Sequence, residues 1–184
     1  MLIFDNVRAA FGRQEILRGV SFRLEPGSLT ALIGKNGCGK STLLKLVLGE
    51  PVANGGTLRI GGSLVVSYVP QGTAGLHGSL RALAQREGLD EPLFKAILRK
   101  LDFSREQFDK DLETYSEGQK KKVLLAKSLC QPAHLYVWDE PLNFIDVLSR
   151  VQIEDLLLAS RPTLLFVEHD RAFRERIATK EITL

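Results

Sequence analysis

Gly34-Lys35-Asn36-Gly37-Cys38-Gly39-Lys40-Ser41-Thr42 constrains the fold more than any other segment of this 184-residue chain. It matches the phosphate-loop pattern G-x-x-x-x-G-K-[ST] at every fixed position. The apolar run at 29–33 (LTALI) predicts a short strand before the loop, and residues 43–48 (LLKLVL) predict a helix after it. A glycine-rich loop between a strand and a helix is the context that separates a phosphate-binding loop from a simple chain reversal.

The residue types of this loop suit a bound phosphate group. Its glycines allow a tight turn and a close approach of the backbone to an anion. The loop N–H groups and the positive end of the following helix then attract the phosphate oxygens. Lys40 can reach the β- and γ-phosphates of a nucleotide, and the Ser41 hydroxyl can bind Mg²⁺. We therefore expect nucleotide contacts from Gly34, Asn36, Gly37, Cys38, Gly39, Lys40, Ser41 and Thr42.

Composition indicates a soluble globular protein with one α/β domain over residues 1–184, since 44% of the residues are hydrophobic and 26% are charged. The net charge of +3 is too small to indicate a nucleic-acid ligand. Two cysteines, Cys38 and Cys130, form no disulfide framework and are predicted to be reduced. No apolar run approaches the roughly 20 residues that span a bilayer. Because residues 1–5 also lack the features of a signal peptide, we expect a cytoplasmic protein.

The segment 135–140 (LYVWDE) is the second strong signal. Its four apolar residues predict a buried parallel strand with two carboxylates at its C-terminal end. In phosphate-loop NTPases a strand-end Asp holds the Mg²⁺ that the loop Ser also binds, which is the role we expect for Asp139 together with Ser41. Glu140 can then take a proton from the attacking water or orient it. An acidic turn without a ligand is the alternative, and the upstream phosphate loop disfavours it.

Three further residues are candidates for ligand contacts, and each has an ordinary alternative. Gln71 follows a predicted strand at 64–69, where it can also be a turn residue. His169 follows a predicted strand at 163–167, where it can contact a γ-phosphate or cap a helix on the surface. Phe11 can stack on a purine base or cover the core as a loop aromatic.

The rest of the chain predicts further strands at 1–7, 20–24 and 57–60, a turn at 54–56 and a closing strand at 181–184.

A helical segment with balanced charge follows the strands. Basic and acidic side chains are equal in number from 78 to about 111, which fits a solvated helical subdomain over 78–115 better than a surface that follows a phosphate backbone. Ser116 is a suitable N-cap for a helix that runs to about residue 129. Lysines at 120–122 oppose the dipole of that helix. Such a local conflict marks either a functional site or a solvated charged face.

In this order, the residues resemble the nucleotide-binding domain of ABC ATPases over nearly the whole chain. The resemblance implies a P-loop NTPase fold, with a mainly parallel core sheet flanked by helices, an N-terminal antiparallel β part and a small helical subdomain. The roles that it implies are an adenine-stacking Phe11, a Walker A loop at 34–42, a Q-loop Gln71, a signature at 116–119 (SEGQ), a Walker B Asp139, a catalytic Glu140, a D-loop Asp146 and a switch His169.

The resemblance also implies ATP and Mg²⁺ as cofactors. The metal ligands would be Ser41, Gln71 and Asp139, and the residues acting in catalysis would be Lys40, Gln71, Glu140 and His169. In the family, ATP lies between the Walker A loop of one domain and the signature of another, so that Ser116, Gly118 and Gln119 would contact the nucleotide of a partner. We therefore expect an ATPase that is weak as an isolated domain and that needs a second ABC domain.

A finer resemblance is to ABC-F proteins, and among them to the second domain of antibiotic-resistance proteins of the Lsa/Vga type that act on the ribosome. It is carried by 116–122 (SEGQKKK), 138–143 (WDEPLN) and 166–170 (FVEHD). It implies twin domains without transmembrane segments and the ribosome as a partner. Glu117 departs from the family pattern, since many ABC ATPases have Gly there.

This chain has one domain and no linker of the ABC-F kind. The expected partner is therefore a second copy in a head-to-tail homodimer or an N-terminal domain that this chain lacks, which would make the chain a fragment or an excised domain. Two other functions fit the same motifs, the ATPase subunit of an ABC membrane transporter and a non-hydrolytic ATP-dependent clamp. The compact stretch at 71–115, without a Glu-Arg-Gly segment before the signature, favours the ABC-F interpretation over a transporter.

Overall fold

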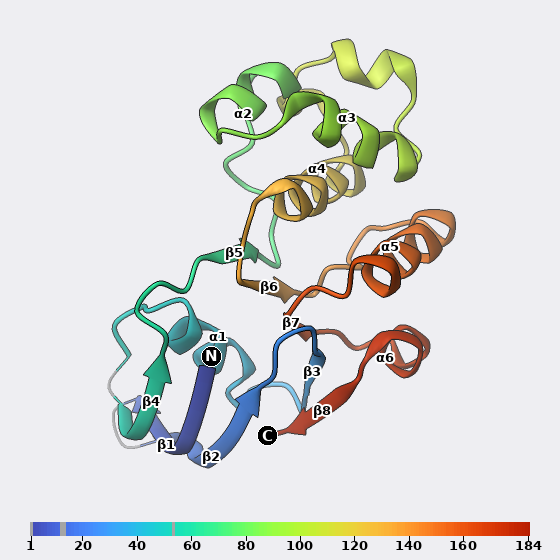
Figure 1. Ribbon diagram of the computed structural model, residues 1–184. Helices are drawn as coiled ribbons and strands as arrows, with labels where there is room; N and C mark the ends of the chain where they lie inside the picture. The colour runs from blue at the N-terminus through green and yellow to red at the C-terminus, as the bar shows by residue number, and fades with distance from the viewer. Residues whose placement is uncertain (1, 12–13, 53) are drawn as a thin grey trace.

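The molecule contains two β-sheets of different character, and helices cover the larger one, while the smaller sheet lies at one end of the molecule (Figure 1). The computed structural model describes residues 2–11, 14–52 and 54–184, apart from the side chain of Phe11. The strands are β1 (Leu2–Phe11), β2 (Gln14–Leu24), β3 (Leu29–Ile33), β4 (Asn54–Ile60), β5 (Val66–Val69), β6 (Leu135–Asp139), β7 (Leu164–Val167) and β8 (Lys180–Thr183). The α-helices are α1 (Lys40–Val47), α2 (Leu80–Arg86), α3 (Glu91–Lys100), α4 (Glu117–Cys130), α5 (Val147–Ser160) and α6 (Arg171–Ile177), and the 3₁₀ helices are η1 (Arg105–Asp109) and η2 (Leu112–Thr114). No helix among the described residues is long and apolar enough to cross a lipid bilayer.

The larger sheet contains five parallel strands in the order β5-β6-β7-β3-β8. Its central strands β3 (LTALI) and β7 (LLFV) are mostly apolar and almost wholly buried, which is typical of a parallel sheet covered on both faces. The smaller sheet contains three antiparallel strands in the order β2-β1-β4. The predicted fold class, an α/β P-loop fold with a mainly parallel core sheet and an N-terminal antiparallel part, is confirmed.

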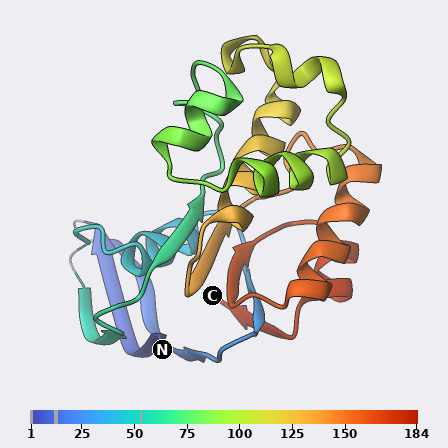
Figure 2. The same cartoon turned by 45° about the horizontal axis from the view of Figure 1, so that its top comes forward.

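Each face of the parallel sheet packs into its own hydrophobic cluster. Trp138 and Phe166 belong to a cluster with apolar side chains from α2 through α6. Val137 and Leu165, one position earlier on the same strands, belong to a second cluster with α1 and the antiparallel sheet. This division follows from the alternation of side chains along a strand. Figures 1 and 2 show α2 and α3 at the end of the molecule opposite the antiparallel sheet.

The predicted turn at 54–56 is wrong, because these residues begin β4. Asn54 pairs with Ala9 and Gly55 with Arg8 on β1. Gly56 has φ +84°, and a Cβ there would lie 2.2 Å from the backbone oxygen of Asn6. Pairing with β1 therefore overrides the turn preference of an Asn-Gly-Gly sequence. The strands expected at 1–7 and 20–24 are likewise longer, since β1 and β2 form a continuous antiparallel pair.

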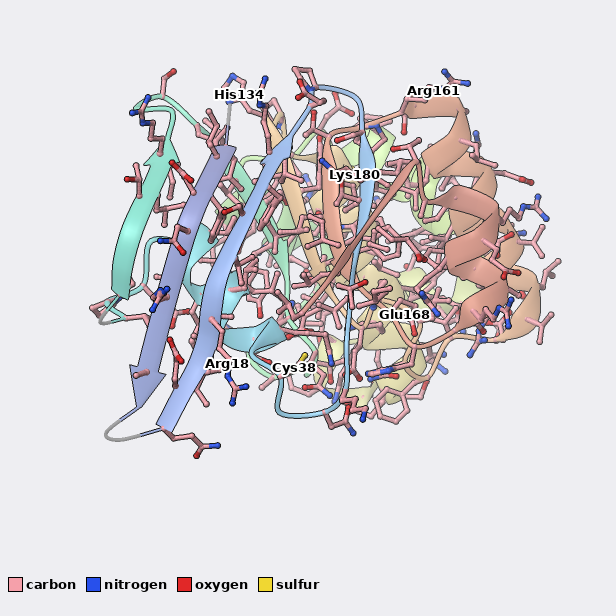
Figure 3. All side chains as sticks on the ribbon, turned by 90° about the horizontal axis from the view of Figure 1, so that it is seen from below. Arg18, Cys38, His134, Arg161, Glu168 and Lys180 are labelled. Carbon is pink, nitrogen blue, oxygen red and sulfur yellow. The ribbon has the colours of Figure 1, made fainter. Side chains whose placement is uncertain are left out.

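The parallel arrangement brings the ends of several strands to one edge of the sheet. Glu168 follows β7 and Cys38 lies in the loop after β3. In Figure 3 both lie toward the same end of the molecule, whereas His134 and Arg161, which precede β6 and β7, lie toward the other end. Residues that follow β3, β5, β6 and β7 can therefore share one site.

Candidate functional site

A pocket of about 360 Å³ lies at this edge of the parallel sheet. The phosphate loop forms one side of it, and Ile16 of β2 also lines it. Three residues that follow other strands complete the lining, namely Gln71, Glu140 and His169. The loop residues that line the pocket are Asn36, Gly37, Gly39, Lys40, Ser41 and Thr42. Residues separated by more than a hundred positions in the sequence thus meet around one volume.

Backbone geometry explains the glycine before Lys40. Gly39 is the N-cap of α1 and has φ +104°, a conformation that favours glycine. A Cβ at Gly39 would lie 2.7 Å from Cδ2 of Leu17 on β2. The loop can therefore pack against β2 only with glycine at this position.

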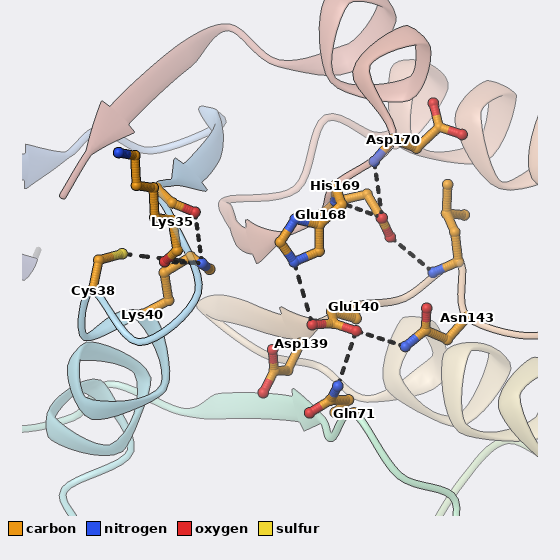
Figure 4. A network of polar contacts seen from close by, with 12 residues as sticks. Lys35, Cys38, Lys40, Gln71, Asp139, Glu140, Asn143, Glu168, His169 and Asp170 are labelled. Atoms are coloured by element: carbon orange, nitrogen blue, oxygen red, sulfur yellow. Dashed lines mark hydrogen bonds and ion pairs between the residues drawn. The ribbon is translucent and has the colours of Figure 1, made fainter.

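Lys40 is buried, and its ammonium contacts the backbone of its own loop. Nζ donates to the carbonyl oxygen of Gly34 at 2.8 Å and to that of Lys35 at 3.0 Å (Figure 4). Gly34, predicted to contact the nucleotide, thus accepts a hydrogen bond from Lys40 but is not among the residues that line the pocket. The Cys38 thiol, 4.0 Å from the same ammonium, lines an adjoining hollow of about 520 Å³ together with residues of β2.

Glu140 is the centre of a network of side chains from three loops (Figure 4). Its Oε2 accepts hydrogen bonds from Nε2 of Gln71 at 3.0 Å and from Nδ2 of Asn143 at 2.7 Å. Nε2 of His169 lies 3.5 Å from Oε1. Glu140 also has φ +49°, a strained conformation for a residue with a side chain. The fold thus holds this carboxylate in one orientation beside the pocket.

Asp139 offers a carboxylate that suits a cation. Burial raises the pKa of Asp139 above its ordinary value and the charge of Glu140 raises it further, while Lys121, Lys40 and His169 oppose the rise. Among the described residues, no hydrogen bond reaches the Asp139 carboxylate. Such a partly buried, unpaired negative charge gains from a nearby metal ion.

Two further candidate oxygen ligands for Mg²⁺ come from Ser41 and Gln71, whereas Asp139, the last residue of β6, precedes the pocket residue Glu140 and is not itself among the lining residues. The hydroxyl of Ser41 and the side chain of Gln71 line the pocket. In the part of the chain that the structure describes, no three His, Cys, Asp or Glu side chains form a metal-binding group. The residues present therefore fit a magnesium ion held by a hydroxyl, an amide oxygen, one carboxylate and phosphate oxygens, which is a typical donor set for nucleotide-bound Mg²⁺.

The predicted signature residues lie at another place. Ser116 caps α4: its hydroxyl accepts from the Gln119 backbone N–H at 3.3 Å, and its own N–H donates to Oε1 of Gln119 at 2.9 Å. Ser116, Gly118 and Gln119 are not among the residues that line the pocket of the phosphate loop. Glu117 accepts hydrogen bonds from Thr73 and from Lys120. Its carboxylate is therefore held against the loop that follows β5.

Gly118 is needed for the close approach of α4 to the loop after β6. A Cβ on Gly118 would lie 2.5 Å from the backbone oxygen of Phe144. We expect Gly118→Ala to destabilise the domain by about 1–3 kcal/mol, since backbone must shift to admit the methyl group. Thermal unfolding measures the change. Gly62→Ala is the matched control, because a Cβ at Gly62 meets nothing within 4 Å. Equal melting temperatures for both variants would contradict the prediction.

Asp146 is the N-cap of α5 and pairs with the buried Lys122. Its carboxylate accepts from the Ser149 backbone N–H at 2.8 Å and from the Ser149 hydroxyl at 2.9 Å, and it lies 2.8 Å from Nζ of Lys122. Burial alone would raise the pKa of Asp146, but the hydrogen bonds from Lys122 and Ser149 outweigh it and hold the pKa well below its ordinary value.

This depressed pKa predicts how stability changes with pH. A carboxyl with a lower pKa in the folded than in the unfolded state stabilises the fold above its unfolded pKa of about 3.9, and the contribution is lost as the pH falls below that value. Asp146→Asn should therefore lower the melting temperature at pH 7 and progressively less below about pH 4. Melting curves from pH 7 to pH 3 test this. Asp109→Asn, on η1, is the control. A gap between wild type and Asp146→Asn that stays constant with pH would contradict the prediction.

Two residues of the site were not assigned a role from the sequence. Asn143 donates to Glu140, as described above, and the buried Glu168 organises the neighbouring backbone. Glu168 accepts from the N–H groups of Leu142 at 3.1 Å, His169 at 2.7 Å and Asp170 at 3.2 Å. The sequence marks Asn143 and Glu168 as site residues only by their position, because each directly follows or lies near the end of a buried parallel strand.

The role predicted for Phe11 falls on a side chain outside the described residues. Its backbone ends β1 and pairs with Gln14 of β2. Gln14 lines the hollow of about 520 Å³, which shares Ile16 and Gly37 with the phosphate-loop pocket. The backbone of Phe11 thus ends beside a hollow that continues from the phosphate loop.

Comparison with known proteins places these features in a family. The family model described as "ABC transporter" matches residues 17–143. The putative ATP-binding protein YdiF of Bacillus subtilis is 38% identical over 92% of this chain and 27% of the relative. The ATP-binding protein Uup of Caulobacter vibrioides is 34% identical over 97% and 31%, and the ribosome protection protein VmlR of Bacillus subtilis is 31% identical over 98% and 33%. The chain thus spans about a third or less of the length of these relatives.

Two solved structures share the fold. One is described as the ATP binding subunit of an ABC transporter, with a TM-score of 0.83 and 24% identity over all of this chain and 85% of the other. The second is a bacterial Atm1-family ABC exporter with ATP bound, with a TM-score of 0.86 and 21% identity over all of this chain and 36% of the other. The family model covers more than half of the residues. The chain therefore belongs to the ABC transporter family, as an ATP-binding domain.

Proposed function

We propose that this domain binds ATP with Mg²⁺ and hydrolyses it as part of an ABC-F protein that acts on the ribosome. The observation that carries the proposal is the pocket in which the phosphate loop faces Gln71, Glu140 and His169. Residues 1–184 would form one ABC domain, with 78–115 as its helical subdomain.

The phosphate loop would hold the triphosphate. Lys40 sits at the N-terminus of α1 and would exchange its bonds to the carbonyls of Gly34 and Lys35 for bonds to phosphate oxygens. The backbone N–H groups from Asn36 to Thr42 would add the contacts typical of such loops. The adenine would extend into the hollow along β2, toward Phe11.

Hydrolysis would depend on the network around Glu140. A carboxylate oriented by Gln71 and Asn143 can accept a proton from the attacking water. His169, 3.5 Å from this carboxylate, would contact the γ-phosphate from the neighbouring loop. Ser41, Gln71 and Asp139 would hold Mg²⁺, which supplies neutralisation of phosphate charge when bound. The chain itself contributes orientation and fixed charges.

A second ABC domain is the proposed partner, either another copy or an N-terminal domain of a longer chain. The signature at 116–119 does not line the pocket of the phosphate loop, so that Ser116, Gly118 and Gln119 would be available to a partner's nucleotide. Apolar side chains lie exposed close by: Phe144 is 66% exposed and Val147 is 77% exposed. The backbone of Phe144 is in contact range of Gly118. Exposed apolar surface beside the signature fits a contact with another protein domain.

The ribosomal partner and the cytoplasmic location are proposed from sequence similarity to other proteins. The ribosome protection protein VmlR is 31% identical over nearly all of this chain, and the segments 116–122, 138–143 and 166–170 resemble ABC-F proteins of the Lsa/Vga type. We accordingly propose a role in antibiotic resistance through ribosome protection, in the cytoplasm.

Two measurements test the proposal. Binding of a fluorescent ATP analogue in the presence of Mg²⁺ tests the nucleotide site, and no binding would contradict it. Phosphate release measured with and without ribosomes tests the partner. We expect slow release from the chain alone and faster release with ribosomes. A rate that ribosomes leave unchanged would contradict the ribosomal role and favour a transporter subunit, while ATP-dependent association without any phosphate release would indicate a clamp.

A further inference from the structure

The lysines at 120–122 do not form a solvated face. Lys121 is 0% exposed and Lys122 is buried. Lys120 is partly buried and lies 3.1 Å from Oε1 of Glu117. A solvated charged face therefore does not explain why three lysines lie in the early turns of α4, where they oppose the helix dipole. The contacts of Lys121 give the clearest alternative explanation.

The ammonium of Lys121 is held by backbone oxygen atoms. Nζ donates to the carbonyl of Pro70 at 2.7 Å, to that of Gln71 at 3.2 Å and to that of Asp139 at 3.3 Å. A lysine ammonium has three N–H donors, and these three bonds use all of them. The first two acceptors follow β5, the third ends β6, and the lysine comes from α4.

The charge of Lys121 is costly to bury. Among the described residues, no carboxylate forms an ion pair with it. Burial lowers the pKa of Lys121 to about 8, against the opposing effect of the charges of Asp139, Glu140 and Glu168. An apolar side chain of similar length would fill the same space at a smaller cost of desolvation. The three hydrogen bonds to carbonyl oxygens offset part of this cost and connect α4 to the ends of β5 and β6.

A second contact joins the same parts of the molecule. Thr73, two residues after Gln71, donates to the carboxylate of Glu117 in the first turn of α4. Figure 1 shows α4 directly above the ends of β5 and β6. The segment 70–73 is thus joined to α4 by two side chains of that helix, Lys121 and Glu117. Lys121 also joins the end of β6 to α4.

We propose that Lys121 is a positioning residue that fixes Gln71 and Asp139 relative to helix α4. The inference rests on the proposed function, in which Gln71 and Asp139 hold Mg²⁺ and the N-terminus of α4 contacts the nucleotide of a partner. A shift of α4 against the partner's nucleotide would then move the metal ligands of its own site. Lys121 does not line the pocket of the phosphate loop and would act through the backbone of Gln71 and Asp139.

The test compares Lys121→Met with Lys127→Met, which removes a lysine from the same helix. Lys127 pairs with Glu87 at 2.8 Å instead of with the strand ends. The affinity for a fluorescent ATP analogue is measured with Mg²⁺ and with EDTA. We expect the gain in affinity due to Mg²⁺ to fall about tenfold in Lys121→Met and to stay within about twofold of wild type in Lys127→Met. A merely structural role would lower both affinities together and leave the gain unchanged, which would overturn the inference.

Hydrogen exchange in nucleotide-free protein separates this inference from the proposed function. Peptides covering 66–73 and 136–140 should exchange about tenfold faster in Lys121→Met than in wild type, and peptides of α5 should not change. Unchanged exchange at 66–73 would overturn the inference even if ATP binds. If wild type binds no ATP but exchange rises as expected, the proposed function fails while the positioning by Lys121 stands. Lys121→Gln, which keeps two N–H donors, replaces Lys121→Met in both measurements if the latter does not fold, with smaller changes in the same direction.

Discussion

Replacing Glu140 with Gln should reduce phosphate release at least about a hundredfold while leaving the affinity for ATP within about twofold, because a general base typically contributes 10²–10⁴ in rate. Gln is nearly isosteric with Glu and can still accept the hydrogen bonds that Gln71 and Asn143 donate at 3.0 and 2.7 Å. It cannot accept a proton. The loss should therefore fall on the chemical step and not on binding.

The same variant should trap an associated state. If ATP joins two domains and hydrolysis separates them, Glu140→Gln with ATP should elute as a dimer on size exclusion, whereas wild type should not accumulate as one. Glu175→Gln is the matched control, since Glu175 lies on α6 and pairs with the exposed Arg171 at 2.6 Å. Normal phosphate release from Glu140→Gln would exclude the proposed general base. A monomeric elution with ATP would contradict the proposed partner contact.

The sequence predicted the parts of this molecule that depend on local or periodic signals. The phosphate loop is one, since Gly39 needs a positive φ and room against Leu17, and both requirements select glycine. The strand ends are another, because buried parallel strands place Gln71, Glu140 and His169 at one edge whatever the loops between them do. The pocket around these residues follows from topology and needs no detailed packing.

Other features depend on neighbours that the sequence does not identify. The 54–56 segment has the composition of a turn, and only its pairing with β1 makes it a strand. Lys121 and Lys120 are identical and adjacent, yet one is buried against three carbonyls and the other pairs with Glu117. Helical periodicity in the sequence does not predict whether Lys120 or Lys121 contacts the end of β6. The contact of Asn143 with Glu140 likewise arises from the shape of one loop.

Replacing Lys40 with Met should lower the affinity for ATP about a hundredfold, which corresponds to about 2.7 kcal/mol. Lys40 is buried at the start of α1, lines the pocket and points its ammonium at the loop backbone, 2.8 Å from the Gly34 oxygen. A phosphate group in the pocket would offer this ammonium charged acceptors in place of neutral carbonyls, and such bonds are roughly twice as strong. Met matches the length of the side chain but provides no donor.

The dependence on phosphate number makes this prediction specific. Because Lys40 would reach the β- and γ-phosphates, Lys40→Met should weaken ADP and ATP binding strongly and leave the much weaker binding of AMP unchanged, as measured by calorimetry or competition with a fluorescent analogue. Lys45→Met is the matched control, because Lys45 is exposed on the same helix. If Lys40→Met binds ATP as tightly as wild type, the phosphates do not sit in this loop. The roles assigned to Glu140, Gln71 and His169 would then fall as well, since all three depend on a γ-phosphate held beside them.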